Sequence, residues 1–231
     1  LDELVARSRE RVAVAKLLEP LEVLREQIDH ASPAGPSFAE ALRAPGVSLI
    51  AEIKRASPSR GALNAQLDPA TQALRYASAG ADAISVLTEP TRFDGSLGDL
   101  RAVHAALTEA SRPLPLLRKD FIVDTYQLLE ARLAGADAVL LIVAALTPDE
   151  LAQLHAEALV LGLTPLVEVH SEAEARAVRA VSGRERPPDV LASAGGWNAR
   201  LGRGLPHAGE ERTVRRAQAP GDLVRQKGAG V

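Results

Sequence analysis

Two patterns of apolar and polar positions alternate along most of the chain. Short and almost wholly apolar runs are separated by amphipathic stretches. The apolar runs cover residues 48–53, 83–88, 113–119, 138–143 and 164–169, and the amphipathic stretches cover 68–80, 96–110, 124–136, 147–162 and 171–181. A continuous apolar run is typical of a parallel strand whose faces are both covered, and parallel strands need crossover connections such as helices. The pattern therefore predicts five consecutive βα units.

The first 45 residues are predicted to be helical. Leucines and valines from Leu1 to Leu17 lie loosely along one helical face, and PLEVLREQI continues the pattern. Pro33, Gly35 and Pro36 then interrupt it. Ser37 is placed to cap a short helix through FAEALRA.

A repeat supports a barrel. The segment AGADA occurs at 79–83 and again at 134–138, each time leading into an apolar run, which indicates a repeated βα architecture. The chain contains neither a Gly-x-Gly-x-x-Gly segment after the first apolar run nor a Walker sequence, so a nucleotide-binding doubly wound sheet loses its main support. We predict an α/β fold, a (β/α)8 TIM barrel with an N-terminal helical extension.

The pattern changes near residue 182. Nine of the 17 glycines lie from Gly183 onward, in a stretch rich in Arg and Pro with no clear strand. We therefore expect residues 1–182 to hold the N-terminal helices and five βα units, and 183–231 to be an aberrant tail of the same domain, with the C-terminal strands incomplete or disordered. A shift of reading frame near codon 182 is one hypothesis for this change.

Composition excludes several classes of function. The net charge is −3, with 46% hydrophobic and 25% charged residues, so neither nucleic acid nor a membrane is an expected partner. The absence of cysteine excludes a disulfide framework, a thiolate metal site and a cysteine nucleophile. The five histidines are scattered, and no metal site is predicted. The chain shows no signal-peptide pattern and no bilayer-spanning run, so we expect a cytoplasmic protein.

Charged residues stand where functional side chains lie in βα barrels, at the ends of strands. Glu52 and Lys54 are two residues apart at the end of the first run, so a strand points both to the same face. Such a pair is either a buried structural ion pair or part of a site, because burial of both charges is expensive. The loop from Ser57 to Gly61 offers hydroxyl and backbone N–H groups to an anion.

The third and fifth runs end in a similar way. Lys119 and Phe121 share one side of the third run, where the lysine either acts as a desolvated proton donor or extends to solvent. Glu168 interrupts the apolar fifth run and is predicted to be a general base or the partner of a lysine. His170 is interpreted as a loop histidine. Phe93 follows the second run, either as a site residue or in loop packing.

The chain resembles the indole-3-glycerol phosphate synthase family over about residues 1–182. The resemblance is carried by the segments LIAEIKRASPSRG, ISVLTEPTRFDGSL, LPLLRKDFIVDTYQLLEARLAGADAVLLIV and PLVEVHSEAEA, which occur in the family's order. It implies a lyase of tryptophan biosynthesis that closes a ring in 1-(2-carboxyphenylamino)-1-deoxyribulose 5-phosphate, with loss of CO2 and water and without a cofactor or metal.

The resemblance also implies roles for individual residues. Lys119 would be the general acid that protonates the ketone oxygen, and Glu168 would assist the proton transfers of dehydration. Lys54, oriented by Glu52, would pair with anionic groups of the substrate. Further substrate contacts are expected from Ser57, Phe93, Phe121 and Leu140.

The tail departs from the family pattern. Asn198 and Arg200 match the family's Asn-x-Arg segment in residue type, but they lie further from Glu168 than in the family, and no apolar strand is expected before them. The Glu-Ser-Gly segment and the eighth strand are missing. The sheet is therefore expected to have open edges and the chain to have little activity. The alternative functions are an inactive remnant and a partner-binding half-barrel, and the chain is expected to be a monomer or weak homo-oligomer. Phosphoribosylanthranilate isomerase, which needs a cysteine, is disfavoured.

Overall fold

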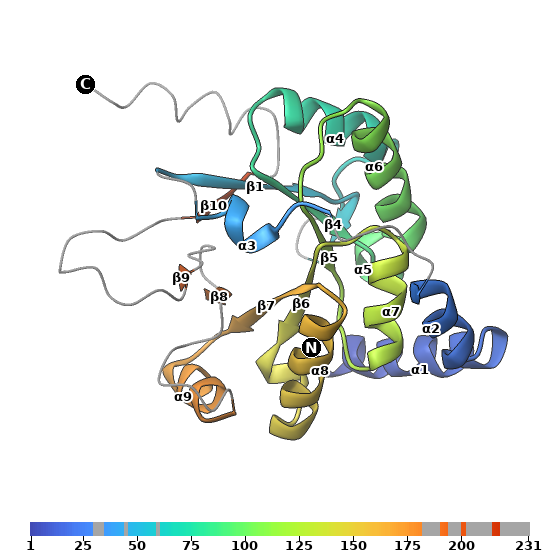
Figure 1. Cartoon of the computed structure of the whole chain (residues 1–231), viewed down its shortest axis with the longest axis vertical. Coiled ribbons are helices and arrows are strands. Elements are labelled where there is room, and N and C mark those ends of the chain that lie inside the picture. Colours follow the sequence, from blue (N-terminus) through green and yellow to red (C-terminus); the bar gives the residue numbers. More distant parts are fainter. Residues whose placement is uncertain are drawn as a thin grey trace.

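A computed structural model describes residues 1–29, 35–43, 46–58, 61–181, 190–193, 200–201 and 214–217 (Figure 1). Three helices precede the sheet, namely α1 (Asp2–Leu18), α2 (Leu21–Asp29) and α3 (Phe38–Ala41). The predicted cap of the third helix is confirmed, because the Ser37 side chain accepts a hydrogen bond from the Glu40 backbone N–H. None of the helices in the described ranges is both long and apolar enough to cross a bilayer.

Five parallel strands in chain order form the centre of the molecule, as predicted. They are β1 (Ser48–Ile53), β4 (Ala83–Leu87), β5 (Leu116–Lys119), β6 (Ala138–Ile142) and β7 (Thr164–Val169). The helices that follow them are α4 (Pro69–Ser78), α6 (Leu97–Glu109), α7 (Thr125–Leu133), α8 (Pro148–Val160) and α9 (Glu172–Val181). Strand β5 starts three residues later than the apolar run, since Pro113 and Pro115 have no N–H to donate to a neighbouring strand.

Short elements that the apolar pattern did not predict occupy two of the connections. Strands β2 (Ala56–Ser57) and β3 (Gly61–Ala62) form an antiparallel pair after β1, and helix α5 (Pro90–Phe93) follows β4. A 3-10 turn, η1 (Val143–Ala145), follows β6. All of these elements lie beyond the carboxyl ends of strands, where barrel loops carry function.

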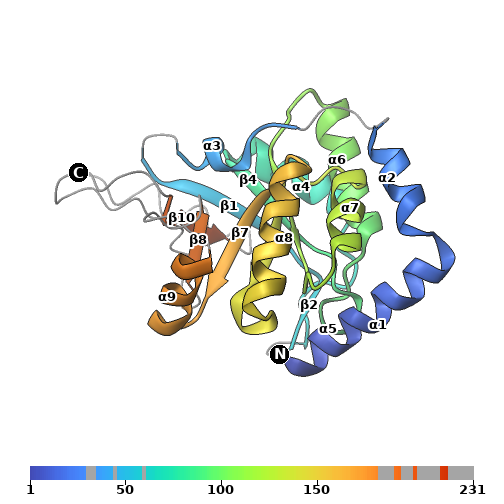
Figure 2. The same cartoon turned by 60° about the horizontal axis from the view of Figure 1, so that its bottom comes forward.

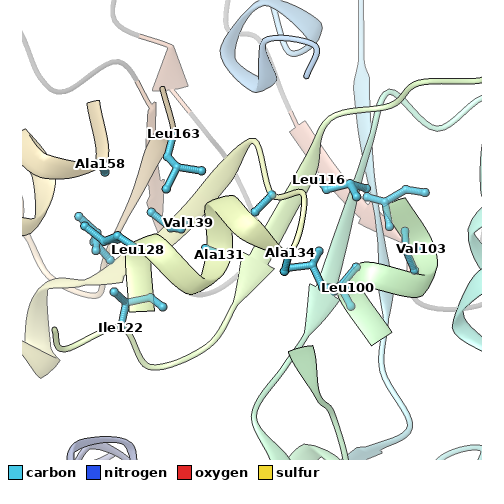
Figure 3. Close-up of a cluster of buried hydrophobic side chains, with 14 of the residues drawn as sticks. Leu100, Val103, Leu116, Ile122, Leu128, Ala131, Ala134, Val139, Ala158 and Leu163 are labelled. Carbon is cyan, nitrogen blue, oxygen red and sulfur yellow. The ribbon is translucent and has the colours of Figure 1, made fainter. Parts of the chain in front are cut away.

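The two faces of the curved sheet have separate apolar cores. On the outer face, strand residues pack against α4, α6, α7 and α8, which follow one another around the sheet (Figures 1 and 2). Figure 3 shows part of this core, with Leu116 and Val139 of the sheet beside Leu100 and Leu128 of the helices. On the inner face, a second cluster comprises Phe38, Ala39, Leu42, Ile50, Ala83, Leu117, Ala138, Leu140, Ile142 and Leu166.

The repeated AGADA segment has the same structural role at both places. The Asp82 backbone N–H donates to the Leu49 carbonyl at 2.9 Å, and the Leu49 N–H donates to the Asp82 carboxylate at 2.7 Å. Asp137 makes the same two bonds with Leu116, at 2.8 and 2.9 Å. Each aspartate therefore fixes the start of the preceding strand of the sheet, which confirms that the repeat marks equivalent βα units.

Short strands also occur in the tail, where the sequence pattern showed no clear strand. Strand β8 (Val190–Ser193) pairs in parallel with β7, β9 (Arg200–Leu201) pairs antiparallel to β8, and β10 (Val214–Ala217) pairs in parallel with β1. Without these partners, the outer sides of β7 and β1 would leave N–H and C=O groups unpaired, and an extended segment can pair with such groups whatever its own apolar pattern.

Strand β1 is consequently not an open edge, contrary to the expectation from the missing eighth strand. Its partner β10 pairs with it from Ser48↔Val214 to Ala51↔Ala217. The described strands run in the linear order β10-β1-β4-β5-β6-β7-β8-β9, without a pairing that closes the sheet on itself. The described part of the chain is thus a curved, incomplete barrel whose central five strands match the predicted units.

Candidate active site

The end of β1 carries a buried ion pair on the inner face. Lys54 Nζ lies 3.1 Å from Glu52 Oε1, and the two side chains are 10% and 1% exposed. Because Glu52 is two residues beyond Ile50, strand alternation places it on the inner face above the apolar cluster. The carboxylate therefore neutralises the lysine and restricts its position at the mouth of the barrel.

A second lysine–glutamate pair spans β5 and β7. Lys119 Nζ lies 3.8 Å from Glu168 Oε2, and the side chains are 16% and 15% exposed. Burial lowers the pKa of Lys119 below its ordinary value, Glu168 opposes this change, and the positive charge of Lys54 adds to it. Lys54 directly follows β1 and Lys119 ends β5, so both lysines stand at the carboxyl ends of strands of the same sheet.

His170 extends this group toward solvent. Its ring Nε2 lies 3.0 Å from Glu168 Oε1, and its side chain is 44% exposed. Glu168 therefore stands between Lys119 on one side and His170 on the other. The interpretation of His170 as a loop histidine missed this contact. The available signal was its two-residue spacing from Glu168, the same spacing that indicated the Glu52–Lys54 pair.

The predicted substrate-contact residues lie in different surroundings. Leu140 belongs to the inner-face cluster and Phe121 packs against it. Ser57 is buried in β2, while Phe93 is half-buried in α5, which contacts β2. The structure thus places Leu140 and Phe121 at the inner-face cluster, and Ser57 and Phe93 in the short elements that follow β1 and β4.

The two candidate residues of the tail are Asn198 and Arg200. Asn198 lies outside the described residues, and Arg200 is placed only by its backbone, in β9. The expectation that no strand precedes them was wrong, because β8 lies between β7 and Arg200. Their proposed part in the site remains a prediction.

A buried polar network fastens α1 beside the site. The Arg11 guanidinium donates to Asp120 Oδ1 at 2.9 Å and to Glu89 Oε1 at 3.2 Å, and both carboxylates are almost completely buried. Asp120 also pairs with Arg118 at 3.2 Å. In addition, the Ser8 hydroxyl donates to the Phe121 carbonyl at 2.6 Å. Because Asp120 and Phe121 directly follow Lys119, α1 holds the segment that carries this lysine.

Little in the local sequence indicates this network. Ser8 and Arg11 have the helical i, i+3 spacing that places them on one face of α1, but no local pattern identifies partners more than 70 residues away along the chain. In the part of the chain that the structure describes, no three His, Asp or Glu side chains are grouped so that they could hold a metal ion.

Taken together, these residues form a candidate acid–base site in a curved, incomplete α/β barrel. Two lysines and two carboxylates converge at the carboxyl ends of parallel strands, above an apolar inner face. A buried lysine with a lowered pKa can donate a proton, and a nearby carboxylate can accept one.

Comparison with known proteins identifies the family. The family model described as "Indole-3-glycerol phosphate synthase" matches residues 1–183, most of the chain, so the chain belongs to the indole-3-glycerol phosphate synthase family. The relatives it matches carry the same description. The Nocardioides sp. (strain ATCC BAA-499 / JS614) protein is 54% identical over 174 residues, 75% of this chain and 65% of that protein.

Two further relatives show how far the similarity extends. The Salinibacter ruber (strain DSM 13855 / M31) protein is 49% identical over 172 residues, 74% of this chain and 62% of that protein. The match to each of these first two relatives thus spans less than two thirds of the relative's length. The Mycobacterium sp. (strain KMS) protein is 45% identical over 235 residues, 100% of this chain and 84% of that protein. That alignment includes the tail, whereas the family model ends at residue 183.

Proposed function

We propose that this chain converts 1-(2-carboxyphenylamino)-1-deoxyribulose 5-phosphate to indole-3-glycerol phosphate, CO2 and water. The observation that carries the proposal is the contact between Lys119 and Glu168 across the inner face, beside the Lys54–Glu52 pair. Family membership supports the same reaction. The chemistry needs a proton donor at a ketone oxygen and a proton acceptor during dehydration, and this site offers both.

In the first step, the aryl carbon that bears the carboxylate attacks the ketone carbon, and Lys119 gives its proton to the ketone oxygen. The lowered pKa of Lys119 makes its ammonium a better acid than an exposed lysine. A carbon–carbon bond forms as the carbonyl π bond breaks, and the oxygen becomes a hydroxyl group. Loss of CO2 then returns the bonding electrons to the ring.

In the second step, Lys54 gives a proton to the new hydroxyl, which leaves as water, and the electrons of the C–H bond next to the nitrogen complete the aromatic indole ring. Glu168 accepts the proton that the substrate loses, and it lies close enough to Lys119 for the two groups to act on adjacent atoms. Lys54, held by Glu52, would face the anionic groups of the substrate and stabilise negative charge at oxygen, and its largely buried position strengthens this interaction.

The remaining predicted residues would bind the two ends of the substrate. Leu140 and Phe121 offer an apolar surface to the aromatic ring, and Phe93 and the Ser57 hydroxyl are proposed as further contacts. Phosphate in barrels of this type binds after the seventh and eighth strands, and Asn198 and Arg200 are proposed contacts on the tail side of the site.

The direct test is turnover of the ring-opened substrate by the full chain, followed by the fluorescence of the indole product. The prediction of little activity rested on open sheet edges and on the loss of half of the phosphate site, and the pairing of β1 with β10 removes the open edge at β1. We therefore expect measurable turnover that Lys119→Met abolishes. A folded chain without turnover would favour the inactive remnant or half-barrel, which concentration-dependent association in size-exclusion chromatography would then support.

Our division of the domain near residue 182 is likewise a proposal. The end of the family match at residue 183 supports this division. In contrast, the alignment with the Mycobacterium sp. (strain KMS) protein covers 100% of this chain, which argues for a tail that retains family sequence. Resequencing the gene around codon 182 tests the frame-shift hypothesis, because an uninterrupted frame that encodes the same tail would refute it. The cytoplasmic location and the monomeric or weakly associated state stay predictions.

A further inference from the structure

The contacts of Glu168 are divided between two cations or potential cations. One carboxylate oxygen, Oε2, faces Lys119 Nζ at 3.8 Å, and the other, Oε1, faces His170 Nε2 at 3.0 Å. The first partner is 16% exposed and the second 44% exposed. The carboxylate therefore bridges an interior lysine and a ring that reaches solvent.

We propose that His170 is a positioning residue for Glu168 and that it carries the proton of Glu168 to solvent. The inference rests on the proposed function, because it assigns the return path of the proton that Glu168 takes up during dehydration. Each of the two lysine–glutamate pairs already joins one positive and one negative group, so the histidine beside Glu168 is not needed to balance charge. The Glu52–Lys54 pair is almost completely buried, whereas the Lys119–Glu168 pair has an exposed partner.

The backbone around His170 limits where its ring can lie. His170 follows β7, so its side chain has the same orientation as that of Glu168 two residues earlier. Its backbone N–H donates to Glu174 Oε2 at 2.7 Å, and the Glu174 N–H in turn donates to the Ser171 hydroxyl at 3.2 Å. These bonds at the start of α9 fix the backbone of His170 and leave its ring beside Glu168.

The proton balance of the step is complete without another reactant. Protonated Glu168 breaks its O–H bond and gives the proton to the lone pair of Nε2, which leaves a carboxylate and an imidazolium. The imidazolium then releases one proton to bulk water. Glu168 is again ready to accept a proton, while Lys119 remains on its other oxygen. Among the described residues, Glu174 also bonds to His170, and it does so by accepting the backbone N–H.

Chemical rescue is the sharpest test of this role. His170→Ala removes the ring from a partly exposed position, which exogenous imidazole can enter. We expect kcat to fall about 10–100-fold, within or just below the usual contribution of a positioned acid–base group, with KM changed less than about twofold. Added imidazole is expected to restore kcat in proportion to the concentration of its neutral form.

His170→Gln separates holding from proton transfer. Glutamine can keep a donor near Oε1 but cannot pass a proton on, so its kcat is expected to lie between those of the alanine variant and the unaltered chain. Glu172→Gln is the matched control, because Glu172 is the first residue of α9, two residues after His170, and pairs with exposed Arg176. Its kcat is expected to equal that of the unaltered chain, with or without imidazole.

A readout that does not depend on turnover tests the contact itself. The 15N NMR signal of the His170 ring Nε2 is expected to move in Glu168→Gln and to stay in place in Glu172→Gln. The inference is overturned if His170→Ala has the kcat of the unaltered chain, or if imidazole does not raise the kcat of His170→Ala. It is also overturned if the Nε2 signal of His170 does not shift in Glu168→Gln. An unaltered chain as inactive as Lys119→Met would instead refute the proposed function, and the NMR measurement would still decide the contact.

Discussion

The two ends of the parallel sheet use acidic residues in opposite ways. At the amino ends, Asp82 and Asp137 each accept a backbone N–H of a neighbouring strand. At the carboxyl ends, Glu52 and Glu168 face lysine side chains instead. A carboxylate that accepts a backbone N–H fixes the fold, whereas a carboxylate that faces a lysine side chain lies at the end of the sheet where we propose that the substrate binds.

The amino end of the sheet is also the end at which α3 packs against the inner face. Phe38 of α3 is fully buried at the inner-face cluster, and the Ser48 hydroxyl below it donates to the Leu42 carbonyl at 3.2 Å. This end of the sheet is therefore closed by packing. Residues that stabilise the fold thus lie at the amino ends of the strands, and residues proposed to react lie at the carboxyl ends, as expected for barrels. Substitutions at the amino end should therefore change the free energy of unfolding, and those at the carboxyl end should change kcat.

The largest effect is expected for Lys119→Met. Removal of the proton donor should lower kcat about 1,000-fold or more, while thermal unfolding should show equal or higher stability, because the buried ammonium is costly. In the unaltered chain, kcat should fall with rising pH below the ordinary range of lysine, since the lowered pKa deprotonates the acid early. A Lys119→Met variant with normal kcat would end the assignment of Lys119 as the acid.

Phe38→Ala should give the converse result at the amino end. Loss of this fully buried ring is expected to reduce the free energy of unfolding by about 3–5 kcal/mol. The kcat per folded molecule should stay the same, because the ring lies at the far end of the strands. Denaturant unfolding and active-site-normalised turnover measure both, with Leu17→Ala at an exposed position of α1 as the control. A selective loss of kcat would contradict the separation.

Asp137→Asn tests the amino end by pH. Burial raises the pKa of Asp137 to about 6, against the lowering effect of the Leu116 and Gly35 N–H groups. Since the unfolded chain ionises near its ordinary value, the stability contribution of this group is full below about pH 4 and is lost as pH rises through about 6, by about 1–3 kcal/mol. The asparagine variant should lack this pH dependence. Asp82→Asn, at the equivalent position, should retain it.

Glu52→Gln is expected to have the smallest effect. The amide keeps the size of the carboxylate but cannot hold Lys54 by charge, so kcat/KM should fall about tenfold, equivalent to about 1.4 kcal/mol. Steady-state kinetics will measure it. A loss as large as that of Lys119→Met would show that Glu52 itself transfers a proton, and the distinction between an orienting and a reacting carboxylate would fail.

Local sequence was sufficient for the central sheet and for the first pair of charges. Continuous apolar runs predicted the five central strands β1, β4, β5, β6 and β7, and two-residue spacing predicted that Glu52 and Lys54 share a face. Local patterns could not show that Arg11 pairs with Glu89 and Asp120, because these contacts join a terminal helix to distant loops. They also failed for β8 and β10, whose strand conformation depends on the partners β7 and β1.

The pairing of β1 with β10 has a consequence for the order of assembly. These strands are separated by most of the chain, so β1 leaves the ribosome long before its partner is synthesised. Until then, one side of β1 offers free N–H and C=O groups to any extended peptide. Nascent chains halted before residue 214 should therefore recruit chaperones or self-associate, and release of the last segment should end that exposure.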